Sequence, residues 1–75
     1  MNTSLRDARR ARKISQAELA DAVGVTQTAI SAYERGSATP SRGVLIAMIH
    51  ALRVNSPTDL GYRWRTELGV ERDPS

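Results

Sequence analysis

Apolar residues recur at intervals of three and four along most of the chain, which is the spacing of one face of a helix. Polar residues fill the positions between them, and clusters of Gly, Ser, Thr and Pro separate the apolar segments. This pattern predicts an all-α, compact five-helix bundle with no strand. The expected helices cover about Leu5–Arg12, Gln16–Val23, Gln27–Arg35 and Arg42–Leu52, and a fifth begins at Pro57.

The fifth helix rests on three apolar residues spaced four apart, Leu60, Trp64 and Leu68. Pro57 suits the first turn of such a helix, because the N–H that proline lacks would have no acceptor there. Gly69 is a suitable stop for the helix. We therefore expect one domain over residues 1–69 and a frayed C-terminal tail over residues 70–75.

The second and third expected helices are short and are separated by one tight turn. Ser15 and Glu18 have the spacing of a capping box, in which each side chain binds the backbone N–H of the other residue. Gly24 stands where the chain must reverse, and Thr26 is a suitable cap for the helix that follows. The apolar seam between the two helices consists of Leu19, Ala20, Val23, Val25 and Ile30.

The outward positions after the turn are Gln27, Thr28 and Ser31. Their short amide and hydroxyl side chains can both donate and accept hydrogen bonds. One interpretation is an ordinary solvated helix surface. In a basic chain, however, a helix that presents such groups suits the edges of base pairs in the DNA major groove.

Composition excludes several classes of protein. The chain has 75 residues and no Cys, which indicates one small domain without disulfides or thiolate metal sites. Its single histidine has no cluster of other ligands, and no nucleophile–base arrangement or phosphate-binding Gly-rich loop is visible, so we expect no metal, no cofactor and no enzymatic activity. With no bilayer-length apolar run and no secretion signal, we expect a cytoplasmic protein of a bacterial cell or a phage-infected host.

The formal net charge is +3, and basic residues are concentrated near the N-terminus. A solvated helix face and a phosphate-contacting surface are equally good interpretations of that run taken alone. Beside the predicted helix-turn-helix, contact with phosphates becomes the better one. The run consists of Arg6, Arg9, Arg10, Arg12 and Lys13, with Asp7 among them.

Five pieces of the chain together resemble the lambda-repressor-like helix-turn-helix family, which includes phage repressors, Cro proteins and xenobiotic-response-element-type regulators. Their order and spacing agree with the family over about residues 5–60. One such piece is a weak signal, but five in register are a strong one. The pieces are Leu5–Gln16, Ala17–Thr26, Ile30–Gly36, Thr39–Ser41 and Ala51–Asn55.

The resemblance implies a role for individual residues. Gln27 corresponds to the principal base reader, and Thr28 and Ser31 share its groove-facing surface. Arg9 and Glu34 correspond to a structural ion pair that fastens the first helix to the recognition helix. The residues expected to contact phosphates are Gln16, Thr26, Arg35, Ser37, Thr39, Arg42 and Arg10. Arg42 departs from the family, which usually has an apolar residue there.

The helix expected over 42–52 is apolar nearly all round, and such a helix favours burial on every side. Scattered exposed small residues are one interpretation, because they are normal on protein surfaces. A self-association patch is the other, formed by this helix or by the expected fifth helix. The candidate residues are Val44, Ala47, His50, Trp64 and Leu68.

These observations favour a sequence-specific regulator that binds double-stranded DNA, typically a repressor of the phage Cro type or from a small mobile element. Homodimerisation is expected at least on DNA, and neither a membrane nor a small-molecule ligand is expected. The alternative is an antitoxin or antirepressor that acts mainly by binding a protein partner.

Overall fold

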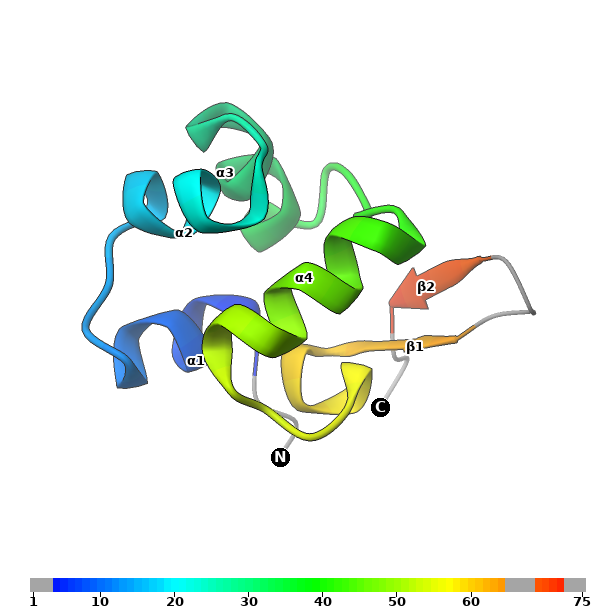
Figure 1. The fold of residues 1–75 in the computed structure, drawn as a ribbon. Coiled ribbons are helices and arrows are strands. Elements are labelled where there is room, and N and C mark those ends of the chain that lie inside the picture. Colours follow the sequence, from blue (N-terminus) through cyan, green and yellow to red (C-terminus); the bar gives the residue numbers. More distant parts are fainter. Residues whose placement is uncertain (1–3, 65–68, 73–75) are drawn as a thin grey trace.

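The computed structural model describes residues 4–64 and 69–72. Its ordered elements begin with four helices and end with a short hairpin (Figure 1). The helices are α1 (Leu5–Ala11), α2 (Gln16–Val23), α3 (Gln27–Arg35) and α4 (Arg42–Leu52). A 3-10 helix η1 (Pro57–Leu60) leads into the antiparallel strands β1 (Tyr62–Trp64) and β2 (Val70–Arg72).

The expectation of a mostly helical domain is confirmed, but the predicted fifth helix and the expected absence of strands are wrong. Gly61 has a left-handed φ of 83°, and it ends η1 after one turn. The next side chains then alternate: Tyr62 is buried and Arg63 is exposed, which is the period of a strand. The four-residue spacing of Leu60, Trp64 and Leu68 indicates a helix only if no left-handed residue interrupts the chain between the first two.

The segment after Gly69 is also not the expected frayed tail, because residues 70–72 form β2. In the hairpin, Tyr62 lies opposite Arg72, and Trp64 lies opposite Val70. Val70 packs against the core. The ordered domain therefore extends through residue 72 rather than ending at 69.

The predicted capping interactions are confirmed. Ser15 Oγ accepts from the backbone N–H of Glu18 at 3.0 Å, and Glu18 Oε1 accepts from the N–H of Ser15 at 2.9 Å. Thr26 Oγ1 accepts from the N–H of Ala29 at 3.1 Å. Gly24 has a φ of 78°, which ends α2 in the conformation that glycine adopts at least cost. These local signals set the turn between α2 and α3.

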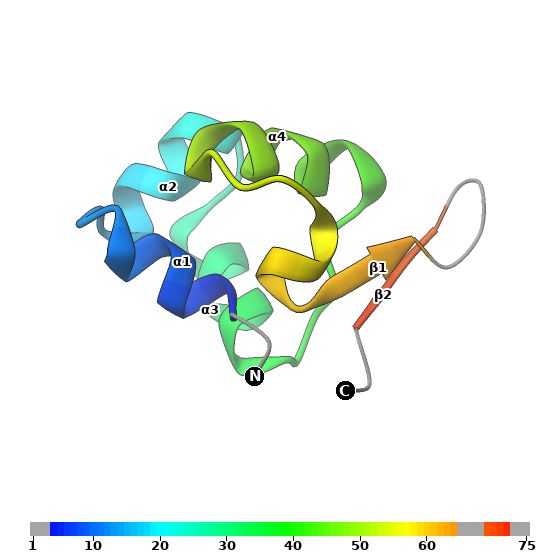
Figure 2. The ribbon, with the colours of Figure 1, turned by 90° about the horizontal axis from the view of Figure 1, so that it is seen from below.

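One hydrophobic core joins all the helices to β1. The helix α2 packs against both α3 and α4, and α1 packs against α3 and η1. Figures 1 and 2 both show the four helices gathered together, with the hairpin to one side near the loop that joins α3 to α4. The buried residues are Leu5, Ala8, Leu19, Ala20, Ile30, Leu45, Met48, Leu52, Leu60 and Tyr62.

Candidate nucleic-acid interface

The helix α3 has one buried and one open side. Ile30 is fully buried at the seam with α2, as predicted. Gln27 and Thr28 are exposed, and Ser31 is half-buried. Because residues four apart share a helix face, Gln27 and Ser31 lie on the same side of α3. The predicted base-contacting surface is therefore open to solvent and is not packed into the domain.

Five predicted contact residues line one open depression of about 370 Å³ between the start of α2 and the outer side of α3. The described residues that line it include no carboxylate. At its edge, Arg35 Nη1 donates to Ser31 Oγ at 2.5 Å, so the guanidinium is held on the open side of α3. The lining residues are Gln16, Gln27, Thr28, Ser31 and Arg35.

Gln16 connects this depression to the interior. It is the first residue of α2, where the first N–H groups of a helix have no intrahelical acceptor. Its side-chain Nε2 donates to Glu34 Oε1 at 3.1 Å. That bond uses one of the two amide N–H groups and orients the side chain at the wall of the depression.

The predicted ion pair between Arg9 and Glu34 is confirmed. Arg9 Nε donates to Glu34 Oε2 at 2.7 Å, and its Nη2 donates to Oε1 at 3.2 Å. Arg9 Nη1 also donates to the carbonyl oxygen of Ile14 at 2.9 Å. The side chains of Arg9 and Glu34 are only 11% and 1% exposed. The pair therefore fastens α1 and the following loop to the end of α3.

The surroundings of this pair shift both pKa values. Burial raises the pKa of the Glu34 carboxyl, but hydrogen bonds from Arg9, Gln16 and Arg6 outweigh it and leave the pKa below its ordinary value of 4.5. The hydrogen bond to Glu34 raises the pKa of the Arg9 guanidinium above its ordinary value, although burial opposes this. The ionised form of the pair is therefore the stable one.

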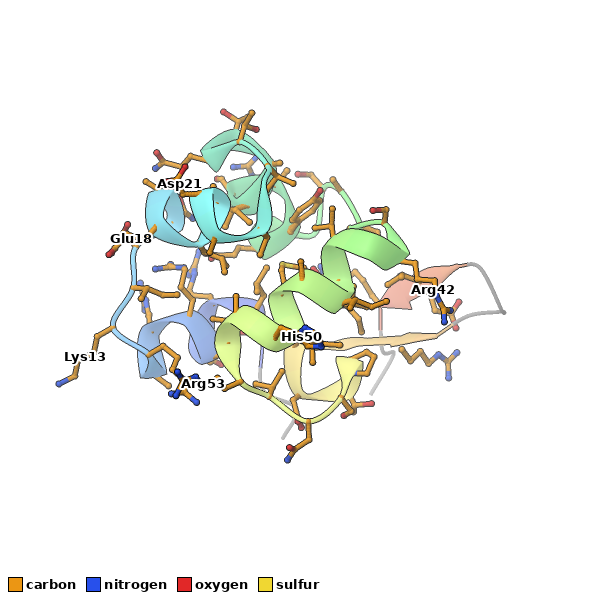
Figure 3. The ribbon with its side chains drawn as sticks, in the orientation of Figure 1. Lys13, Glu18, Asp21, Arg42, His50 and Arg53 are labelled. Carbon is orange, nitrogen blue, oxygen red and sulfur yellow. The ribbon has the colours of Figure 1, made fainter. Side chains whose placement is uncertain are left out.

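The basic run of α1 divides into different environments. Arg6 Nε lies 3.5 Å from Glu34 Oε1, with its side chain half exposed. Arg12 Nε donates to the carbonyl oxygen of Leu52 at 3.1 Å, which ties α1 to the end of α4. Arg10 is exposed, and so is Lys13, whose side chain points away from the helices in Figure 3. Arg12 thus has a structural contact that its sequence position did not indicate.

The other predicted phosphate-contacting residues lie around α3. Thr26 caps the helix at its start. Beyond its end, Ser37 Oγ donates to the carbonyl oxygen of Ala32 at 3.3 Å, and Thr39 is exposed. Arg42 is exposed at the start of α4, as predicted, on the side of the hairpin in Figure 3. All four are exposed, and in chain order they run from the start of α3 to the start of α4.

Two residues that the sequence pattern did not single out contact the end of α3. Tyr62 is 2% exposed, and its hydroxyl donates to the carbonyl oxygen of Tyr33 at 3.4 Å. Arg72 lies against Gly36, the residue that ends α3. The alternation of Tyr62, Arg63 and Trp64 is a signal that favours a strand over 62–64, whereas residues 70–72 show no such alternation.

The proposed self-association surface is only partly visible. Val44 and Ala47 are half-buried, and His50 is exposed on α4 (Figure 3). Ile46, which the sequence analysis did not select, is 37% exposed. The side chain of Trp64 and all of Leu68 lie outside the described residues.

Among residues 4–64 and 69–72, no helix is both long enough and apolar enough to span a bilayer. Within the same residues, His, Asp and Glu side chains form no group of three that could hold a metal ion.

This arrangement of two short helices, a glycine turn and an open second helix defines a helix-turn-helix domain. The Cro/C1-type helix-turn-helix family model matches residues 5–59, and the chain belongs to this lambda-repressor-like family. Two structures of the P22 c2 repressor are similar. One is a crystal structure of the repressor in complex with synthetic operator 9T in the presence of Tl+. It matches with a TM-score of 0.70 and 41% sequence identity, and the match covers 75% of this chain and 83% of the repressor chain. The other is a solution structure of the DNA-binding domain of the repressor. It matches with a TM-score of 0.68 and 42% sequence identity, and the match covers 80% of this chain and 84% of the other chain. No curated protein matches the chain.

Proposed function

We propose that the protein binds double-stranded DNA through the outer side of α3, placed in the major groove, and represses transcription. The observation that carries this proposal is the open depression at the start of α2 and along α3, with Gln16, Gln27 and Arg35 in its lining. Amides, hydroxyls and one guanidinium line it, which suits base edges flanked by phosphates. The similarity to a repressor crystallised with an operator supports the same function.

Base reading falls mainly to Gln27. It is exposed at the first position of α3, and a glutamine can bind adenine through N6 and N7 together. Thr28 offers a methyl group to thymine or a hydroxyl to another base. Ser31 accepts a hydrogen bond from Arg35, so its own O–H remains able to donate. With no long basic side chain at positions 27–32, part of the sequence preference comes from DNA shape.

Phosphate contacts surround that reading surface. The free N–H groups at the start of α2 and the positive end of the helix dipole favour an anion beside Gln16. The guanidinium of Arg35 extends from the other side of the depression. The remaining proposed phosphate contacts are Thr26, Ser37, Thr39, Arg42 and Arg10.

Two variants on the same helix separate base reading from phosphate binding. Gln27→Ala should relax base preference, so that affinity for a selected duplex falls about 5- to 150-fold while affinity for random duplex is retained. Arg35→Ala should weaken binding to both duplexes and reduce the dependence of log affinity on log salt by about 1. Fluorescence anisotropy on a duplex obtained by in vitro selection measures both effects.

Asn55→Ala is the matched control, because it removes an exposed amide outside the depression. It should change neither the affinity for the selected duplex nor the affinity for the random duplex. Equal losses on selected and random DNA for Gln27→Ala would refute its role as a base reader.

A further inference from the structure

The hairpin places a cation at the end of α3. A Cβ atom built on Gly36 would lie 2.5 Å from Arg72 Nη1 and 3.1 Å from Arg72 Cζ. The guanidinium of Arg72 therefore rests directly on the backbone of Gly36, which ends α3 with a φ of 81°. Arg72 is nevertheless exposed to solvent. This exposed cation lies against the residue between Arg35 and Ser37, two of the expected phosphate contacts.

The strand register explains this position. Residues directly opposite each other in an antiparallel pair share a face, so Arg72 is on the same face as Tyr62. Tyr62 is buried in the core, and its hydroxyl binds the last turn of α3. The pairing of Tyr62 with Arg72 thus aims the arginine at the end of α3. Arg63 and Glu71 occupy the opposite face and bind each other, with Nε–Oε1 at 2.6 Å.

The charges around Arg72 are unbalanced. Glu34 lines a small cavity of about 40 Å³ together with Arg72, but its carboxylate is already bound by Arg9 and approached by Arg6. Glu71 is bound by Arg63. Among the described residues, Arg72 forms no ion pair within 4.0 Å. Within the described part of the chain, the end of α3 therefore carries surplus positive charge, which attracts an anion.

We propose that Arg72 contacts a DNA phosphate and that the hairpin extends the backbone contact of the α3–α4 loop. The proposal rests on the DNA-binding function argued above. The hairpin lies beyond residues 5–59, the segment that the family model matches, so the family match does not assign this contact. Its partner is the phosphate backbone of duplex DNA, without regard to sequence.

The test measures the salt dependence of binding to a random 30-base-pair duplex and to a selected duplex, between 50 and 200 mM KCl. Arg72→Gln should reduce the slope of log affinity against log salt by about 0.9 on both duplexes, the value of one phosphate contact. The ratio of the wild-type affinity to the Arg72→Gln affinity should then fall about 3.5-fold between 50 and 200 mM KCl. Arg72→Lys should restore most of the slope, because it keeps the charge.

Arg63→Gln is the charge-matched control, since it removes one cation from the opposite face of the same hairpin. It should leave the slope near the wild-type value. A wild-type slope for Arg72→Gln, or an equal reduction for Arg63→Gln, would overturn the proposal. If urea unfolding shows that Arg72→Gln is destabilised and its slope is unchanged, Arg72 is structural and the proposal fails. A wild-type protein that binds neither duplex would overturn the proposed function itself, and this contact with it.

Discussion

At the residue scale, Glu34 contributes both to the stability of the domain and to the geometry of the candidate site. Its nearly buried carboxylate accepts hydrogen bonds from Arg9 in α1 and from Gln16 at the wall of the depression. An uncompensated buried charge is costly, so this residue depends on both partners. We infer that Glu34 orients Gln16 for phosphate while it anchors α1.

The depressed pKa of Glu34 makes stability depend on pH. Because folding lowers this pKa, the ionised pair stabilises the folded state above the unfolded value of about 4.5 and loses this contribution as pH falls through the folded value. Glu34→Gln should cost about 3 kcal/mol or more of the free energy of unfolding at pH 7, because it leaves Arg9 without its anion. The difference from wild type should shrink toward pH 3, as measured by urea unfolding.

Glu71→Gln is the matched comparison, because it also breaks an Arg–Glu pair, but one in which the side chains are 53% and 36% exposed. Surface pairs contribute little, so this variant should change the free energy of unfolding by less than about 1 kcal/mol at any pH. A constant difference between Glu34→Gln and wild type from pH 3 to pH 7 would contradict the argument.

At the element scale, two left-handed glycines end the helices that form the site. Gly24 ends α2, and Gly36 ends α3. They differ in what surrounds them, since a Cβ at Gly24 would meet nothing within 4 Å, whereas one at Gly36 would meet the guanidinium of Arg72. At Gly24, only the backbone conformation requires glycine. At Gly36, the guanidinium of Arg72 also needs the space that a Cβ atom would occupy.

Substituting alanine should separate these two constraints. Gly24→Ala and Gly36→Ala should each cost about 1–2 kcal/mol of the free energy of unfolding, because alanine is strained at positive φ. Gly36→Ala should also displace the flexible end of Arg72 and reduce the salt slope of DNA binding, which Gly24→Ala should not do. Urea unfolding and anisotropy titrations measure the two effects.

Gly43→Ala is the control, since Gly43 lies in α4 with open space around it and without a positive φ. It should stabilise the protein by about 0.5–1 kcal/mol, because alanine loses less backbone entropy in a helix. A Gly36→Ala variant as stable as wild type would refute the assigned strain.

At the scale of the whole molecule, the 75-residue chain presents a small candidate reading surface. Two copies on neighbouring half-sites, one helical turn or about 34 Å apart, would combine their contacts. We propose this arrangement on DNA, with the exposed side of α4 around Ile46 and His50 as the candidate contact between copies.

Half-site spacing tests the arrangement. Inserting 5 base pairs between two selected half-sites turns one copy about half a helical turn away from the other, so cooperative binding should disappear. Replacing the base pairs between the half-sites without changing their number serves as the control for sequence change, and cooperative binding should then persist. Gel-shift titrations separate singly from doubly bound duplex, and unaltered cooperativity after the 5-base-pair insertion would exclude a contact between the copies.

The sequence by itself determined α1 to α4, their caps, the turn at Gly24 and the open side of α3. These features follow from hydrogen bonds and side-chain periodicity within a few residues, which a local pattern records. The pairing of Arg9 with Glu34 joins residues 25 apart, and only the resemblance to the family predicted it.

Only the tertiary structure decided the rest. The spacing of apolar residues after Pro57 fits a helix, but burial of Tyr62 in the core and pairing of β1 with β2 select a hairpin. The bond from Gln16 to Glu34 and the seat of Arg72 on Gly36 likewise join segments far apart in the chain. Such contacts depend on which faces the packed core leaves adjacent, and no local pattern of residues specifies that.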